Sequence, residues 1–334
     1  MLASIAHRTP PRSYGPWEQV ASTLAEGLVA RGHDVTLFAT SDSLTSAHLH
    51  SEAAAGYEED DSIDAKVYEA LHIAAVFERA GQFDVNSNQF DFLPLAFSRL
   101  VSTPMVTTIH GFSSPRIVPV FQAYDDIAHY VSISDADRHP DLTYAATIHH
   151  GIDVGSFSFG AGDGGYLLFL GRIHPDKGTR EAIEVARGAG LPLVIAGVVH
   201  DVDYHRCYVE PFVDGESVRF VGAVGPAERD TLLGGAVALL HLIGFDEPFG
   251  LSVVESLAAG TPAIAYPRGS LPELVADGRT GFLVHDPVEA TEAVSRIGRI
   301  ARAECRREAE TRFTSERMVV DYERLFSAVV ANTQ

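Results

Sequence analysis

The chain has 334 residues, of which 46% are hydrophobic and 21% charged, proportions typical of a globular protein and a length that favours two domains. Its net charge of −20 argues against a nucleic-acid partner. Residues 1–150 hold 8 Lys and Arg against 19 Asp and Glu, and no apolar run approaches the roughly 18 residues of a membrane-spanning helix. We therefore expect no strong membrane association.

The cysteines and the N-terminus indicate the compartment. Cys207 and Cys305 lie far apart and fit no CxxC pattern, which is typical of a chain kept in a reducing environment. The apolar stretch at the start of the chain is too short for a signal peptide, and the charges around it are wrong for one. These features predict a cytoplasmic protein.

Short apolar runs alternate with amphipathic stretches along nearly the whole chain, a pattern that predicts βα units and parallel sheets. In the first half, a helix is predicted over residues 16–31, closed by Gly32. Strands are predicted over residues 2–6, 34–39, 105–109, 127–132 and 146–149. We assign residues 1–158 to a first Rossmann-like domain.

The second half repeats this alternation after residues 160–165, a glycine-rich segment that is the clearest linker in the sequence. Its predicted strands are residues 166–170, 193–196, 218–221, 237–243, 263–266 and 282–284. We assign residues 165–313 to a second Rossmann-like domain and residues 314–330 to a final helix. The fold class is α/β, with two doubly wound domains that face each other across a cleft.

Two carboxylates converge near the start of a helix predicted over residues 250–259. Glu247 lies in the loop before this helix, and Glu255 lies about one turn into it. A helix N-terminus offers unpaired N–H groups and a positive dipole end, so it attracts a phosphate. A phosphate held there leaves both carboxylates free to bind hydroxyls. This mixture of groups fits a nucleotide sugar, with its diphosphate between a ribose and a second sugar.

Two cations follow the first strand of the second domain. Arg172 and Lys177 lie in the sequence Gly-Arg-Ile-His-Pro-Asp-Lys-Gly, between a predicted strand and a helix. At a strand end they point toward the cleft, where they suit a pyrophosphate leaving group that gains charge as it departs. The structural alternative is a surface ion pair with a nearby acid such as Asp176.

Other candidates carry weaker signals. Gly15, before the first helix, allows a ligand to approach the backbone closely, and His110 ends an apolar strand, where a histidine is more often structural than catalytic. Ser270 begins a Ser-x-x-Glu capping box. Residues 58–61 predict a solvated acidic loop, and residues 149–151 a hinge turn. No set of histidines, cysteines or carboxylates has metal-ligand spacing.

Together these motifs resemble retaining glycosyltransferases of family GT4, which have the two-domain GT-B fold. The resemblance covers nearly the whole chain and is strongest over residues 171–284. Its most specific part joins residues 246–250 and Glu255 to the Ala-Ala-Gly-Thr-Pro and Gly-Ser-x-Pro-Glu sequences that follow. The Gly-Arg-x₄-Lys-Gly sequence at residues 171–178 is similar to a second family motif, and residues 312–326 look like a helix that crosses back to the first domain.

The resemblance implies a role for each matching position of the second domain. Glu255 would bind both ribose hydroxyls, and Glu247 would hold hydroxyls of the transferred sugar near its anomeric carbon. Arg172 and Lys177 would clamp the diphosphate. Val221 would lie on the strand that borders the nucleotide base. Phe249, Gly250 and Leu251 would present backbone N–H groups to phosphate or sugar.

In the first domain, the resemblance implies that Gly15 approaches the diphosphate on closure and that His110 lies near the reacting centre. It also implies that no metal or other cofactor is required. The donor would be a UDP-sugar, and the acceptor a small molecule or an oligosaccharide. The chain looks like the antibiotic-pathway members that actinomycetes have in this family.

Three departures from the family pattern stand out. The first predicted strand is short, so the native start is expected to be longer, and family members often have Pro at Leu242 and Asn at His150. The first domain also has few insertions, which leaves the acceptor pocket undefined. Two rival functions remain open: a non-catalytic sugar-nucleotide-binding regulatory subunit, and a sugar-nucleotide epimerase or phosphorylase on the same fold.

Overall fold

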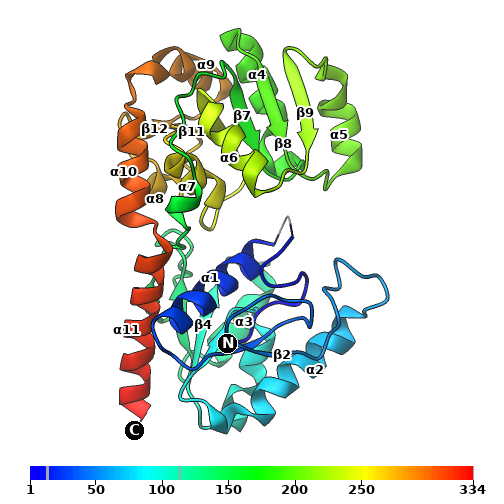
Figure 1. The fold of residues 1–334 in the computed structure, drawn as a ribbon, viewed down its shortest axis with the longest axis vertical. Coiled ribbons are helices and arrows are strands. Elements are labelled where there is room, and N and C mark those ends of the chain that lie inside the picture. Colours follow the sequence, from blue (N-terminus) through cyan, green and yellow to red (C-terminus); the bar gives the residue numbers. More distant parts are fainter. Residues whose placement is uncertain (13–14, 113, 334) are drawn as a thin grey trace. The chain divides into compact units, whose positions relative to one another are not determined.

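The computed structural model describes residues 1–12, 15–112 and 114–333. The chain divides into two compact units: Met1–Gly151 with Ser315–Gln334, and Ile152–Thr314. Each unit has a parallel β-sheet with helices packed around it (Figure 1). This agrees with the α/β class predicted from the sequence.

The first unit contains two groups of parallel strands. One pairs β1 with β2, and the other has the order β3-β4-β5-β6. Leu2 connects them, because it forms parallel bridges to both Phe38 and Asn88. The bounds are β1 (Thr36–Phe38), β2 (His48–His50), β3 (Asn86–Asn88), β4 (Met105–Ile109), β5 (His129–Ser132) and β6 (Tyr144–Thr147).

The strand predicted over residues 2–6 is therefore wrong in extent, since only Leu2 forms sheet bridges there. The physical reason lies in the next residues, where the Ser4 hydroxyl accepts a hydrogen bond from the Ala6 N–H at 3.1 Å and bends the chain. The polar strand β3 was not predicted, because Asn-Ser-Asn is not an apolar run. All three of its side chains are nevertheless buried.

The helices of the first unit are α1 (Pro16–Ala30), α2 (Ala65–Glu78), α3 (Val118–Ala123) and α11 (Ser315–Thr333), with short 3₁₀ turns η1 (Ala80–Gln82), η2 (Leu93–Leu100) and η3 (Pro115–Ile117). Helix α1 begins with Pro16, which suits the first helical position, and a glycine follows its last turn. Helix α11 packs against α1, and Leu24 and Val319 belong to the same buried cluster. The last helix thus belongs to the first unit.

The second unit has one six-stranded parallel sheet in the order β12-β11-β10-β7-β8-β9. Its strands are β7 (Leu167–Leu170), β8 (Leu193–Ala196), β9 (Val218–Gly222), β10 (Ala238–His241), β11 (Ala263–Ala265) and β12 (Gly281–Leu283). The chain first winds outward from β7 to β9, then restarts at β10 on the other side of β7. The direction of winding therefore reverses between β7 and β10. In doubly wound sheets, ligands bind outside the carboxyl ends of strands at such a reversal.

Helices lie between these strands and after the last of them. They are α4 (Thr179–Ala189), α5 (Val202–Tyr208), α6 (Pro226–Gly235), α7 (Leu251–Ala258), α8 (Leu271–Leu274), α9 (Pro287–Arg296) and α10 (Arg302–Arg312), with the 3₁₀ turns η4 (Val154–Ser156), η5 (Pro175–Lys177), η6 (Glu210–Phe212) and η7 (Ile297–Arg299). None of the helices in the described parts of the chain combines the length and apolar character needed to cross a bilayer.

The glycine-rich segment 160–165 lies within the second unit, not between the units. The Gly160 N–H donates to the Ala259 carbonyl at 3.0 Å, and the Gly162 N–H donates to the Gly234 carbonyl at 3.0 Å. Arg302 also donates to the Gly160 carbonyl at 2.8 Å. These bonds fix the segment, so the boundary falls earlier, between Gly151 and Ile152.

Candidate functional site

Lys177 and Glu247 meet where the winding of the second sheet reverses. β7 and β10 are neighbours, with Leu168 paired to Leu239. Lys177 comes from the turn after β7 and Glu247 from the loop after β10, and Lys177 Nζ lies 2.9 Å from Glu247 Oε2. The Lys177 ammonium also lies 4.4 Å from the centre of the Phe245 ring. The sequence had placed these two side chains in the same site but had not paired them.

Glu247 stays ionised although it is largely buried. Burial by itself raises the pKa of this carboxyl, but His241 and Lys177 outweigh that effect and lower the pKa to about 2. His241, the last residue of β10, is buried, and its Nε2 lies 3.4 Å from Glu247 Oε2. The site therefore holds a permanent negative charge beside a cation and an imidazole.

Gly178 brings the Lys177 turn against the chain that follows β10. It has φ 74°, and a Cβ atom at this position would collide with the Leu242 carbonyl. The Gly244 N–H donates to the Asp176 carbonyl across the same contact at 2.7 Å. The Lys-Gly pair of the motif thus supplies both the cation and the close approach that places it.

A second close approach holds the backbone of Glu247. The Ser270 N–H donates to the Glu247 carbonyl at 2.9 Å, and the Ser270 hydroxyl donates to the Phe249 carbonyl. Ser270 makes no capping bond to α8, so the predicted capping box is wrong: its hydroxyl is used to fix the loop of Glu247 instead. A Cβ atom at Gly269 would collide with the Glu247 backbone.

We expect Gly269→Ala to lower the free energy of unfolding by about 1–3 kcal/mol, because the new methyl group meets the Glu247 backbone at a positive φ. Chemical denaturation measures the loss. Gly278→Ala is the matched control, since Gly278 also has a positive φ but has no atom within 4 Å of the place that a methyl group would take. Equal losses in the two variants would contradict the role given to the Gly269 contact.

Glu255 is buried in α7 and faces a different cation. Arg229, from α6, places Nη1 3.1 Å from Glu255 Oε1. Burial raises the pKa of the Glu255 carboxyl, while the Arg229 charge opposes this rise. Gly250 caps the start of α7, and the Phe249 side chain is buried against Phe313 at a ring distance of 6.2 Å. Phe249 therefore has only its backbone to offer a ligand.

Arg172 forms an ion pair with Asp176 in the same turn. Its Nη2 lies 2.8 Å from Asp176 Oδ2, while His174 Nδ1 lies 2.6 Å from the other Asp176 oxygen. This is the ion pair that the sequence offered as the structural alternative. Val221, which was predicted to border the base, lies on the edge strand β9 and is partly exposed.

In the first unit, His110 is buried just after β4. Its Nε2 lies 2.9 Å from Gln89 Oε1, and because the Gln89 amide donates to Thr108, this oxygen accepts from the imidazole N–H. Burial lowers the pKa of His110 to about 3, so the ring is neutral near pH 7. His110 also stacks on Trp17 at 5.5 Å and contacts His150 at 3.4 Å.

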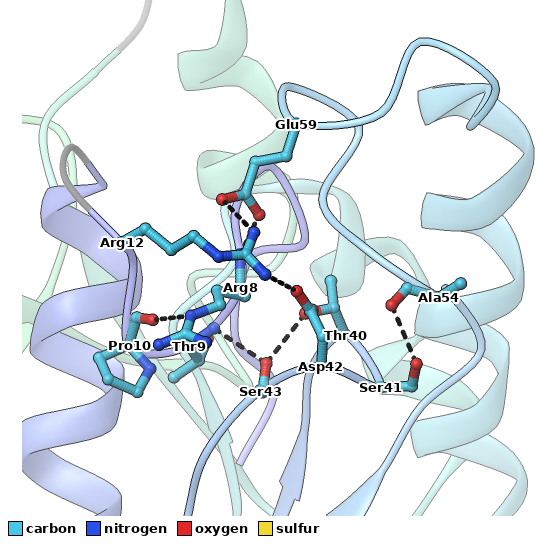
Figure 2. A network of polar contacts seen from close by, with 10 residues as sticks. All are labelled: Arg8, Thr9, Pro10, Arg12, Thr40, Ser41, Asp42, Ser43, Ala54 and Glu59. Carbon is cyan, nitrogen blue, oxygen red and sulfur yellow. Dashed lines mark hydrogen bonds and ion pairs between the residues drawn. The ribbon is translucent and has the colours of Figure 1, made fainter.

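Gly15 precedes α1 with φ 152°, and earlier in the chain residues 8–12 take part in the polar network in Figure 2. Arg12 pairs with Asp42 at 3.0 Å and with Glu59 at 3.3 Å, so three loops of the first unit are joined. The Arg8 N–H also donates to Glu59 at 3.0 Å. Residues 58–61 are all exposed, which agrees with the predicted solvated loop, and Glu59 within it also binds Arg8 and Arg12.

Three residues near these sites were missed from the sequence: His241, Arg229 and Gln89. His241 had a usable signal, since it is a histidine within the apolar run predicted as a strand over residues 237–243, although only the structure shows that strand β10 ends there. Arg229 and Gln89 had none, because their partners lie on other elements. Within residues 1–12, 15–112 and 114–333, no three side chains among His, Cys, Asp and Glu gather into a metal-binding group.

Residues 157–316 match the family described as Glycosyl transferases group 1. The chain is 29% identical over 216 residues to the glycogen synthase of Mycobacterium tuberculosis, covering 56% of this chain and 52% of that protein. It is also 29% identical over 251 residues to the phosphatidyl-myo-inositol mannosyltransferase of the same organism, covering 66% and 65%. The matches thus span between about half and two-thirds of the length of these relatives.

Solved structures extend the likeness to nearly the whole chain. AviGT4, a glycosyltransferase involved in avilamycin A biosynthesis, is 23% identical with a TM-score of 0.71, covering 97% of this chain and 93% of AviGT4. HepE of Anabaena, solved in complex with UDP-glucose, is 18% identical with a TM-score of 0.75, covering 95% and 97%. The sucrose-phosphate synthase of Thermosynechococcus elongatus is 18% identical with a TM-score of 0.79, covering 99% and 96%. The fold is accordingly the GT-B fold, with two Rossmann-like units.

Proposed function

We propose that this chain, whose residues 157–316 match the family described as Glycosyl transferases group 1, is a member of that family and a retaining glycosyltransferase that uses a nucleotide-diphosphate sugar. The observation that carries the proposal is the pair of Lys177 and Glu247 at the reversal of the second sheet. That place combines a cation for a diphosphate with an ionised carboxylate for sugar hydroxyls.

The donor is held by groups of the second unit. Lys177 and Arg172 clamp the diphosphate, assisted by the N–H groups at the start of α7. Glu255 binds the ribose hydroxyls, and Glu247 binds hydroxyls of the transferred sugar. Arg172 and Lys177 each have a carboxylate partner in the free protein, so the donor exchanges one anion for another at both cations.

The reaction replaces one bond at the anomeric carbon with another on the same face. The bond to the phosphate oxygen breaks as the bond to the acceptor oxygen forms, and the leaving phosphate oxygen takes the acceptor proton. Charge on the departing diphosphate is met by two cations and a helix dipole, which makes a metal ion unnecessary. In the first unit we keep His110 and Gly15 as candidate site residues, since His110 is buried just after β4 and Gly15 directly precedes α1.

Likenesses to named proteins support the choice of substrates. The structure of HepE with UDP-glucose favours a UDP-sugar as the donor. The acceptor we propose is a small molecule or an oligosaccharide, in antibiotic or other natural-product biosynthesis, as for AviGT4. The identity of 23% to AviGT4 supports a shared fold, and the avilamycin pathway is one candidate among such pathways. We place the enzyme in the cytoplasm.

A thermal-shift panel of UDP, TDP, GDP and ADP tests the proposal. UDP is expected to raise the unfolding temperature, by the equivalent of about 2.7 kcal/mol at a concentration of 100 Kd, with or without EDTA. A shift that EDTA removes would contradict metal independence. No shift with any diphosphate would overturn the assignment of the donor site.

Product analysis separates the rival functions. A transferase releases UDP in proportion to glycosylated acceptor. An epimerase converts the UDP-sugar without an acceptor, and a phosphorylase requires inorganic phosphate. A protein that binds UDP but turns over no donor with any acceptor in a broad panel would be a regulatory binding subunit.

A further inference from the structure

Glu247 uses one of its two oxygens for both of its partners. Lys177 Nζ lies 2.9 Å from Oε2, and His241 Nε2 lies 3.4 Å from the same atom. Oε1 has no hydrogen-bond or ion-pair partner in the second unit, all of whose residues the structure describes. The carboxylate is thus anchored through Oε2, which leaves Oε1 available to a ligand.

In the proposed reaction Lys177 faces two anions. It pairs with Glu247 in the free protein, and the donor brings a diphosphate to the same place. When Lys177 turns to the phosphates, Glu247 loses its nearest opposite charge while its side chain remains only 13% exposed. A buried carboxylate without a partner is strongly unfavourable, so another group must compensate it.

Resting on the function proposed above, we propose that His241 takes over from Lys177 as the partner of Glu247 when a donor diphosphate draws Lys177 away, and that His241 binds a proton from solvent as it does so. His241 is therefore a positioning residue. It keeps Glu247 aimed at the transferred sugar after Lys177 has left, and it does not touch the reacting atoms itself.

The charges around His241 set the direction of this change. The Lys177 ammonium disfavours a protonated imidazole, and the Glu247 carboxylate favours it. With both present the two influences oppose each other. Once the ammonium has moved to the phosphates, the carboxylate dominates and the imidazolium is stabilised.

The other titratable groups near His241 have a fixed charge or a partner of their own. Tyr266, at the end of β11, donates its backbone N–H to the His241 carbonyl at 3.3 Å, and burial raises the pKa of its phenol to about 12, so it stays neutral. Arg172 and Asp176 form their own ion pair in the Lys177 turn, and His174 lies against Asp176. His174 is therefore the other histidine near the Lys177 turn, and its variant serves as a comparison in the test.

The test is calorimetric titration with UDP-glucose, a diphosphate diester with no ionisation of its own in the range where histidines titrate, about pH 5 to 8. Titrations in a sulfonate and an amine buffer, which differ in ionisation enthalpy, count the protons taken up. We expect the wild-type protein to take up protons on binding. We also expect its affinity to fall as pH rises through this range, by up to about tenfold per pH unit for one proton.

Variants assign the proton. His241→Gln keeps an N–H donor but cannot protonate, so it is expected to lose the uptake and to bind with little dependence on pH. His174→Gln and His129→Gln are expected to keep the uptake, the second because His129 begins β5 in the first unit. Uptake that persists in His241→Gln would overturn the proposal, and its disappearance in His174→Gln would assign the proton to His174 instead.

The wild-type protein decides the matter even where His241→Gln does not fold. Equal heats in the two buffers would mean that binding takes up no proton, which contradicts the inference and leaves the proposed function standing. A protein that binds neither UDP nor UDP-glucose would instead contradict the proposed function.

Discussion

Lys177→Ala is expected to lower kcat by about 10²- to 10³-fold while changing KM for the donor much less. The reason is that a cation facing the departing diphosphate interacts most strongly when that group has gained its charge, in the transition state. In the proposed function Lys177 is this cation, and it lies in the turn after β7, 2.9 Å from Glu247. Release of UDP from the UDP-sugar, followed at saturating and limiting donor, measures both constants.

Lys66→Ala is the matched control, since Lys66 is the only other lysine of the chain and lies exposed in α2 of the first unit. It should leave both constants unchanged. A Lys177→Ala enzyme with normal kcat would remove Lys177 from the catalytic role. A rise in KM alone would show that it binds donor and transition state equally.

The second unit was the easier half to predict. Its strands are short apolar runs separated by helices, and strands form close to all six predicted positions. Parallel strands buried on both faces require such runs, so the local sequence carries most of the information. The segment 160–165 misled prediction because glycine composition favours a linker, whereas bonds to Gly234 and Ala259 fix it in place.

The first unit deviates more, because β1, β2 and β3 have three residues each and β3 is polar. The strand β3 is Asn-Ser-Asn, and its side chains are satisfied by contacts such as that of Asn88 with the Asp91 carbonyl at 2.8 Å. A buried polar strand of this kind depends on partners distant in sequence, so periodicity cannot reveal it.

In the candidate site, too, some features could be predicted from the local sequence and others could not. The motifs identified Lys177, Glu247 and Glu255, because strand ends and helix starts can be read from the sequence. Pairings between elements could not be read, as with Arg229 and Glu255, which come together only through the packing of α6 on α7. The hydrogen bond from the Ser270 hydroxyl to the Phe249 carbonyl could not be predicted either, because the capping-box pattern concerns only residues 270–273.

Glu247→Gln is expected to reduce sugar transfer strongly, because in the proposed function the carboxylate binds the transferred sugar. UDP affinity is expected to be kept or raised, because Lys177 no longer has to leave Glu247 for the diphosphate. The substitution should also change acid stability. The Glu247 pKa falls from 4.5 to about 2 in the folded protein, a difference that corresponds to roughly 3 kcal/mol of unfolding free energy. A carboxyl with a lowered folded pKa stabilises the protein above its unfolded pKa and loses this contribution as pH falls through the folded value.

The stability gap between wild type and Glu247→Gln should therefore be full near pH 7, shrink below about pH 4.5 and be nearly closed near pH 2. Urea denaturation across this range measures it, with Glu292→Gln, at an exposed position of α9, as the matched control. A gap independent of pH would mean that the charge of Glu247 adds nothing to stability. Lys177 and His241 would then be partners in geometry alone, and the exchange between them on donor binding would lose its electrostatic basis.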